Sequence, residues 1–90
     1  MTMFPLGQRR ITQRAMEVLQ RFTLSPHPYF ARHQMGDWGD LEEEDRKSNE
    51  VAVGLGERIF SAYNIPNGPK VWVITEADRS ATTLLLPDEY

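Results

Sequence analysis

The chain has 90 residues, no cysteine and a formal net charge of −3 at pH 7. This length supports one domain with a single modest core, and the absence of cysteine excludes disulfides and thiolate metal sites and favours a reducing cytoplasm. No apolar run approaches the roughly 20 residues of a membrane-spanning helix, and the N-terminus lacks a signal-peptide pattern. We therefore expect a cytoplasmic domain without membrane contact.

The net charge conceals an uneven distribution along the chain. Residues 1–36 carry five arginines against one glutamate, a net +4, whereas residues 37–50 carry −5 and residues 51–90 carry −2. Such asymmetry occurs at nucleic-acid-binding faces, at acidic partner surfaces, and where opposed segments neutralise each other across a fold. We expect neutralisation across the fold and keep the other two as alternatives.

The first third of the chain predicts an extended lead-in and two helices. Residues 1–6 carry no helical pattern and are expected to be extended or frayed. Thr12 is a candidate N-cap for a helix over about residues 13–22, whose apolar side chains share one face. We expect that face to cover a sheet, and a groove for a partner is the alternative. The Ser25-Pro26 pair predicts a short second helix that ends near Gly36.

A third helix is predicted from an acidic start. Asp40 and Glu43 have the spacing of a capping box, and the neighbouring acids suit the positive end of a helix dipole. The helix should continue to about residue 55 and end on Gly56 in a left-handed conformation. The stripe expected to face the sheet is thin and consists of Leu41, Ser48, Val51, Ala52 and Leu55.

Two residues near this helix are expected to organise the fold. Trp38 lies between two glycines in turn sequence, which predicts a buried anchor whose indole N–H needs an acceptor. Asn49 is locally unfavourable in mid-helix and shares a face with Asp45. We therefore expect Asn49 to bond to the turn at residues 37–39.

The second half of the chain predicts three strands. Residues 58–63 alternate in polarity, and the Asn67-Gly68 pair that follows is the strongest turn signal in the chain. Residues 70–76 and 81–86 flank a polar break at residues 77–80, which predicts a β-hairpin. In the first hairpin strand, alternation puts Trp72, Ile74 and Glu76 on one face and Val71, Val73 and Thr75 on the other. Both faces are mostly apolar, which is typical of a central strand covered on two sides.

These elements predict an α+β fold with a single domain over residues 1–90. Residues 1–56 should be mainly helical, and residues 57–87 should form a β-meander. The expected architecture is two or three N-terminal helices packed on a three-stranded antiparallel sheet.

His33 and Asp37 form the first candidate catalytic pair. A histidine oriented by a carboxylate is the minimum for general base catalysis, because the carboxylate fixes the tautomer and raises basicity. The structural alternative is a histidine that caps a helix end beside an aspartate that closes a turn. A metal site formed by His27, His33 and Asp37 is a further alternative. No phosphate-cradling loop, nucleophile elbow or zinc spacing is present in the sequence.

Arg58, Glu76 and Arg79 complete the set of candidate catalytic residues. They lie in or beside the predicted strands, where Glu76 falls on a largely apolar face. A structural ion pair with an arginine is one interpretation. If both arginines instead converge with His33, their guanidinium forks would recognise a phosphate or a carboxylate.

Several of these segments together resemble one family of proteins. They are His33–Gly39, Asp45, Asn49, Gly56–Tyr63 and Trp72–Pro87. Over about residues 28–90 the chain is similar to a family of small bacterial proteins of plasmids, phages and integrated elements, known as plasmid-related proteins. Some are labelled subunit M of a type I restriction enzyme. That label does not fit, because a methyltransferase needs a far larger cofactor-binding α/β domain. The resemblance implies a role in a mobile element and no particular activity.

Two functions from different classes are carried forward. The first is a non-catalytic accessory or interaction protein of a bacterial mobile element that docks a protein partner, with nucleic-acid binding and a homodimer as alternatives. The second is a small metal-independent ribonuclease or nucleotide-binding enzyme that uses His33 as base with Arg58 and Arg79 as phosphate clamps. We expect no metal and no other cofactor in either case.

Overall fold

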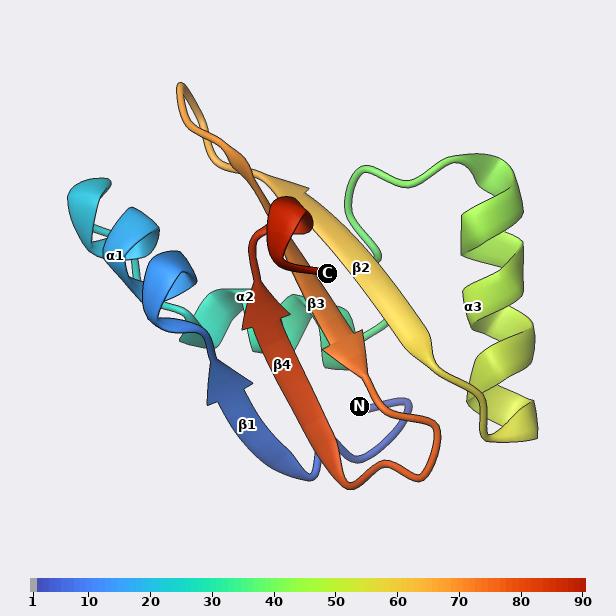
Figure 1. Ribbon diagram of the computed structural model, residues 1–90. Coiled ribbons are helices and arrows are strands. Elements are labelled where there is room, and N and C mark those ends of the chain that lie inside the picture. Colours follow the sequence, from blue (N-terminus) through green and yellow to red (C-terminus); the bar gives the residue numbers. More distant parts are fainter. Residues whose placement is uncertain (1) are drawn as a thin grey trace.

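The computed structural model describes residues 2–90 as one four-stranded sheet with three α-helices and a short 3-10 helix (Figure 1). In chain order the elements are β1 (Gln8–Ile11), α1 (Gln13–Arg21), α2 (His27–Gln34), α3 (Glu43–Leu55), β2 (Ile59–Asn64), β3 (Lys70–Thr75), β4 (Ala81–Leu85) and η1 (Pro87–Glu89). The predicted α+β class is therefore confirmed. None of the helices in this part of the chain is both long and apolar enough to cross a membrane.

The sheet is mixed, which corrects the predicted three-stranded antiparallel meander. The strand order is β1-β4-β3-β2; β2, β3 and β4 are antiparallel, and β1 joins β4 as a parallel strand. The sequence of β1 gives little strand signal, because three of its four residues are polar. Pairing fixes its place instead: the Gln8 N–H donates to the Ser80 carbonyl at 2.9 Å, and the Thr12 N–H donates to the Leu84 carbonyl at 3.1 Å.

Residues 2–7 before β1 form no helix, as expected, but this segment is anchored in the core and is not frayed at Phe4 and Leu6. Phe4 and Leu6 are buried in the core. Gly7 then turns the chain into β1 with a φ of 64°, and a Cβ at this position would collide with the carbonyl oxygens of Arg79 and Ser80. Both the positive φ and the close approach require glycine.

The first two helices lie where the sequence predicts them. Thr12 caps α1, because its Oγ1 accepts a hydrogen bond from the Ala15 N–H at 3.1 Å. The buried residues of α1 are Ala15, Val18 and Leu19, and those of α2 are Tyr29, Phe30 and His33. The apolar face of α1 is thus part of the core and is no groove for a partner.

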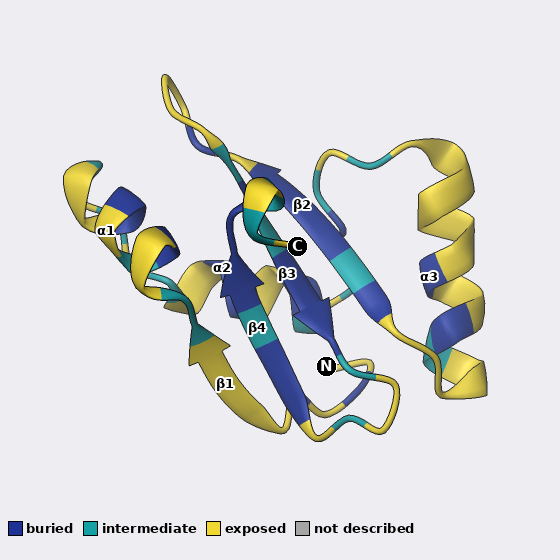
Figure 2. Ribbon diagram, in the orientation of Figure 1, coloured by how far each residue is buried: buried dark blue, intermediate teal, exposed yellow. Residues whose placement is uncertain are grey.

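α3 departs from its predicted start and from its predicted stripe. The helix begins at Glu43 with Glu42 at its N-cap position, so Asp40 is not its cap. The Asp40 N–H instead donates to the Ala62 carbonyl of β2 at 2.7 Å. Val51 and Leu55, expected to face the sheet, are exposed (Figure 2). α3 therefore lies beside the sheet and covers neither face (Figure 1).

Asn49 holds α3 against the outer edge of β2. Its Nδ2 donates to the Phe60 carbonyl at 2.6 Å, and the Phe60 N–H donates to Asn49 Oδ1 at 3.1 Å. The amide side chain thus pairs with β2 as a neighbouring strand would. The expected bond from Asn49 to the turn at residues 37–39 is wrong. The predicted left-handed end of the helix is confirmed, since Gly56 has a φ of 71°.

Trp38 is the buried anchor that its turn sequence predicts. Its side chain is 2% exposed, and the indole N–H donates to Glu50 Oε2 of α3 at 2.9 Å. The adjacent main chain bonds to β2, because the Ala62 N–H donates to the Trp38 carbonyl at 3.1 Å. Trp38 therefore joins the loop before α3 to both the helix and the sheet.

The sheet has one helix-covered face and one open face. Strand alternation directs Val71, Val73 and Thr75 toward the helical side, where they are fully buried. The sequence predicts that both faces of β3 are covered, but the α-helices cover only one of them. The segment from the end of β4 through η1 crosses the other side (Figure 1). We call that side the open face. Its apolar residues on β2, β3 and β4 include Phe60, Trp72, Ile74 and Leu85.

Candidate functional site

His33 lies in the core between α2 and the sheet. Its side chain has no exposed area, its Nδ1 lies 2.6 Å from Ser61 Oγ, and its Nε2 lies 2.9 Å from Thr75 Oγ1. The chain of hydroxyls continues, since Thr75 Oγ1 lies 2.7 Å from Thr82 Oγ1, which donates to the Leu6 carbonyl at 2.7 Å. One network therefore joins α2, three strands and the N-terminal segment.

The direction of this network follows from counting protons. The single hydroxyl proton of Thr82 is used on the Leu6 carbonyl, so Thr75 must donate to Thr82. Thr75 then has no proton for His33 and accepts one from Nε2–H. Because a neutral imidazole carries one proton, Nδ1 of His33 accepts the Ser61 hydroxyl. The core thereby selects the Nε2–H tautomer.

Burial also keeps His33 neutral. It lowers the pKa of the imidazole from 6.5 to about 3. No carboxylate faces the ring: its hydrogen-bond partners are hydroxyls, and its ring neighbours are Phe4 and Trp38. Both nitrogens are occupied and no solvent reaches them, so a substrate proton has no path to this base without opening of the core.

Asp37 lies on the surface and does not orient His33. Its Oδ2 pairs with Arg32 Nε at 2.7 Å, and its Oδ1 accepts the Gly39 N–H at 3.2 Å. The bond from Arg32 holds the pKa of the Asp37 carboxyl below its usual value. This is the turn-closing role that the sequence left as an alternative.

A polar hollow of about 360 Å³ surrounds the Arg32–Asp37 pair. Its lining residues are Arg32, Asp37, Gly39, Asp40, Tyr63 and Asn64. The charges in it are already paired, since Lys70 Nζ lies 3.1 Å from Asp40 Oδ2. Burial raises the pKa of Tyr63 to about 12, and its hydroxyl donates to the Asp37 carbonyl at 2.6 Å.

The metal site that the sequence left as an alternative does not form. Within residues 2–90, no three histidine, aspartate or glutamate side chains come close enough to hold a metal ion. His27 is exposed on α2, whereas His33 is sealed in the core.

Arg79 binds main-chain carbonyls and lines neither the polar hollow nor the pocket of the open face. Its Nη2 donates to the Ala52 carbonyl near the end of α3 at 3.0 Å, and its Nη1 donates to the Glu57 carbonyl at 2.7 Å. Two further carbonyls of its own turn lie within hydrogen-bonding distance. The residue has a φ of 62°, which lets the side chain reach back to α3. Arg79 thus fastens the hairpin turn to the end of that helix.

Arg58 and Glu76 are the two candidate residues that the structure brings together. Arg58 Nη2 lies 3.4 Å from Glu76 Oε1, and both side chains are about half exposed. Arg58 also donates to the hydroxyl of Tyr90. The side chains of the five sequence candidates therefore do not converge: His33 lies in the core, Asp37 in a surface turn, Arg58 and Glu76 at the open face, and Arg79 bonds main-chain carbonyls, that of Glu76 among them.

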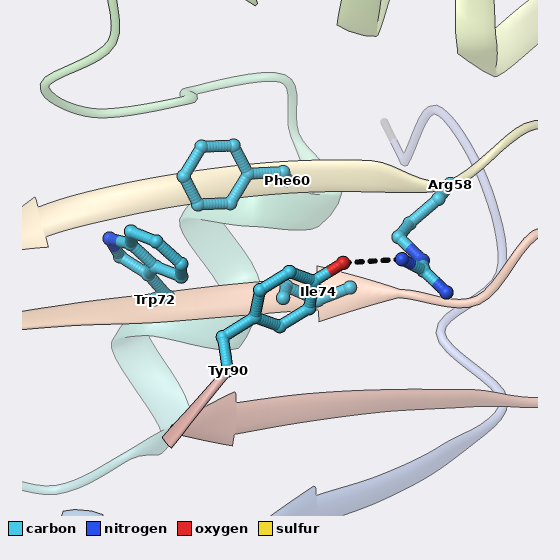
Figure 3. A pocket seen from close by; sticks show the side chains of 5 residues that line it. All are labelled: Arg58, Phe60, Trp72, Ile74 and Tyr90. Atoms are coloured by element: carbon cyan, nitrogen blue, oxygen red, sulfur yellow. Dashed lines mark hydrogen bonds between the residues drawn. The ribbon is translucent and has the colours of Figure 1, made fainter. Parts of the chain in front are cut away.

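The open face carries an aromatic hollow that we call the aromatic pocket (Figure 3). It has a volume of about 250 Å³ and is lined by Arg58, Phe60, Trp72, Ile74 and Tyr90. The Phe60 and Trp72 rings meet edge to face with centroids 4.8 Å apart, and the Trp72 and Tyr90 centroids lie 5.8 Å apart. In Figure 3 Tyr90 lies across Ile74, and its hydroxyl points to Arg58. Among the described residues that line the pocket, Arg58 is the one with a charged side chain, and Glu76 pairs with it.

The sequence predicts only part of this pocket. Arg58 is one of its candidate catalytic residues, and alternation along β3 places Trp72 and Ile74 on the same face of the strand. Phe60 could have been added, because its β2 register sets it opposite Ile74 on the same side. No local sequence pattern predicts that Tyr90 reaches the pocket, because its position depends on the path of the chain through η1.

Comparison of the chain with protein-family models, with curated proteins and with solved structures found no match.

Proposed function

We propose that this chain is a non-catalytic cytoplasmic interaction protein that docks a protein partner at the aromatic pocket. The observation that carries the proposal is the pocket itself: three aromatic side chains and one arginine gather on a sheet face that none of the described α-helices covers. The resemblance to small proteins of plasmids and phages supports an accessory role in a bacterial mobile element.

The composition of the pocket favours a protein partner. Tryptophan, tyrosine and arginine are the residue types that most often dominate the binding energy of protein interfaces, usually at the desolvated centre of the contact. Trp72 is partly buried, which fixes its ring, and Tyr90 is 67% exposed. A partner would therefore bury new aromatic area against a preformed support.

Tyr90 indicates which group the pocket accepts. Its phenol ring contacts Trp72, and its hydroxyl accepts a hydrogen bond from Arg58. A partner's aromatic side chain would pack against the exposed Tyr90 ring and the partly buried Trp72 ring, as these two rings pack against each other. We therefore propose an aromatic side chain as the group that packs in the pocket.

The enzyme alternative receives less support from the geometry. A ribonuclease that uses His33 with Arg58 and Arg79 needs these groups around one phosphate. His33 is instead sealed in the core, and Arg79 is held by main-chain carbonyls. RNA incubated with the purified wild type is expected to stay intact. Cleavage that disappears in a folded His33→Gln variant would overturn the non-catalytic proposal.

A comparative capture experiment tests the proposal directly. Immobilised wild type, Trp72→Ala and Tyr90→Ala are compared with Leu55→Ala, a control at an equally exposed residue on α3. The proposal expects a bacterial protein retained by wild type and Leu55→Ala and lost from both pocket variants. Circular dichroism confirms that each variant is folded. Equal retention by all four proteins, or none by wild type, would contradict it.

A further inference from the structure

The two edge strands of the sheet differ in whether their outward main-chain groups have hydrogen-bond partners. At the β2 edge, Asn49 pairs with both main-chain groups of Phe60. Two residues further along β2, the Ala62 N–H donates to the Trp38 carbonyl at 3.1 Å, and the Ala62 carbonyl accepts the Asp40 N–H at 2.7 Å. The outward groups at the centre of β2 are therefore satisfied, and this edge is closed to a further strand.

The β1 edge has no such cover. The Gln8 and Thr12 N–H groups point inward to β4, so alternation directs the main-chain groups of Arg9 and Ile11 outward. Within residues 2–90 no strand pairs with that side, because β1 ends the strand order. Figure 2 shows β1 almost wholly exposed at the margin of the sheet. This edge presents donors and acceptors at the spacing of a strand.

The charge around β1 is positive and unneutralised. Arg9 and Arg10 are exposed, and in the part of the chain that the structure describes neither forms an ion pair. The two acids of η1 are already engaged: Asp88 pairs with Arg14 at 2.9 Å, and a carboxylate oxygen of Glu89 accepts the Thr12 hydroxyl at 2.8 Å. Arg10 donates only to the neutral Gln8 side chain, at 3.1 Å, so an incoming strand with carboxylates would meet two guanidinium groups whose charge no described acid pairs with.

We propose that the β1 edge binds an extended acidic segment of a partner protein, which adds to the sheet as a fifth strand. Main-chain hydrogen bonds to Arg9 and Ile11 would hold the segment, and its carboxylates would pair with Arg9 and Arg10. A second copy of this chain is disfavoured as the occupant, because two β1 edges would bring like-charged arginines together. The inference rests on the edge and its charges and is independent of the aromatic pocket.

Nuclear magnetic resonance of the intact chain with short synthetic peptides tests this proposal. The probe is Ac-Glu-Val-Glu-Val-Glu-Val-NH2, and the matched controls are its Lys-Val counterpart and an N-methylated Glu-Val peptide that cannot pair as a strand. We expect the acidic probe at millimolar concentration to shift the amide signals of Arg9 and Ile11 and to slow their hydrogen exchange. The amide of Phe60 on the closed edge should not change, and neither control should bind.

Two variants separate charge from strand pairing. Arg9→Ala removes a guanidinium and keeps the outward N–H, whereas Arg9→Pro removes both and leaves the bonds to β4 intact. Arg9→Ala should lower the affinity for the acidic peptide a few-fold. Arg9→Pro should lower it by about tenfold, the order expected when a main-chain hydrogen bond is lost as well.

Three outcomes would overturn the proposal. The first is equal binding of the acidic and basic peptides, and the second is a set of shifted signals centred on Trp72 rather than β1. The third is self-association of the wild type that Arg9→Pro abolishes, which would make a second copy the occupant. None of these outcomes bears on the aromatic pocket variants, so the two proposals fail separately.

Discussion

At the scale of single residues, the hydrogen-bond network around His33 has one consistent direction. The network ends on a main-chain carbonyl, which can only accept, and this end condition fixes every donor back to the imidazole. His33 thus links α2 to the sheet as a neutral side chain. A buried polar group with all partners satisfied contributes specificity to the packing, and removal of one partner is costly.

We expect His33 to be the Nε2–H tautomer at pH 7. Two-bond proton–nitrogen correlation spectra of the imidazole separate a protonated from an unprotonated ring nitrogen. They should show Nε2 protonated and Nδ1 unprotonated. A protonated Nδ1 would mean that the network runs in the opposite sense and that the proton count is wrong.

The folded protein should lose stability as pH falls below 6.5. The folded-state pKa of His33 is about 3 and its ordinary value is 6.5, so the unfolded state takes up the proton first. The His33 contribution is complete above pH 6.5 and is lost toward pH 3, with a slope of about 1.4 kcal/mol per pH unit. Urea titrations between pH 7.5 and 5 measure the slope before most carboxylates protonate.

The histidine variants supply the control for this pH dependence. His33→Gln should abolish most of the slope, and His27→Gln, at an exposed position on α2, should keep it. A slope that survives in His33→Gln would assign the pH dependence to other groups.

At the scale of elements, the sequence predicts the helices and hairpin better than the contacts between them. Thr12, Gly56 and the alternating strands are local signals, and the structure confirms them. β1 has no local signal, because its pairing depends on the distant edge of β4. Asn49 was correctly recognised as out of place in a helix, but its partner on β2 depends on where the whole helix docks.

Asn49→Ala should release α3 from β2. The change removes two hydrogen bonds and leaves the main-chain groups of Phe60 without partners, at an expected cost of about 1–3 kcal/mol in the free energy of unfolding. Lys47→Ala, at an exposed position of the same helix, should stay within about 0.5 kcal/mol of wild type. Equal effects of the two variants in urea titration would show that α3 is not held by Asn49.

Two glycine substitutions should act in opposite directions. Gly7→Ala places a methyl group against the carbonyls of Arg79 and Ser80 at a positive φ, and we expect a loss of about 2 kcal/mol or more. Gly54→Ala points into open space on α3 and should gain up to about 1 kcal/mol from helix propensity. Thermal unfolding measures both, and a neutral Gly7→Ala would argue against the tight approach of β1 to β4.

At the scale of the whole molecule, one face of the sheet forms the core, and the other face and the β1 edge are the surfaces that we propose bind partners. One face packs on α1, α2 and the N-terminal segment, and this packing includes His33. The open face holds the aromatic pocket, whose Tyr90 is exposed, and the β1 edge holds the exposed Arg9 and Arg10. The sequence could name Arg58, Trp72 and Ile74 but not their gathering with Tyr90, because that depends on the return of the chain over β3.

The uneven charge of the sequence also has a place in the fold. Basic β1 and α1 lie at one margin of the sheet and acidic α3 lies at the other (Figure 1). Part of the charge is neutralised across the fold as expected, by ion pairs that directly join oppositely charged side chains of different segments: Arg14–Asp88, Arg32–Asp37 and Lys70–Asp40. The remaining charge of the two margins gives one molecule surfaces of opposite sign.

Site-specific photocrosslinking tests the proposed interaction most directly. A benzoylphenylalanine in place of Tyr90 keeps an aromatic ring at the pocket, and the same group in place of Leu55 is a matched control, because the two residues are 67% and 68% exposed. With both proteins present in bacterial cells, we predict a discrete protein adduct from position 90 and none from position 55. The same adducts from both positions, or none from position 90, would contradict the proposal that the aromatic pocket docks a partner.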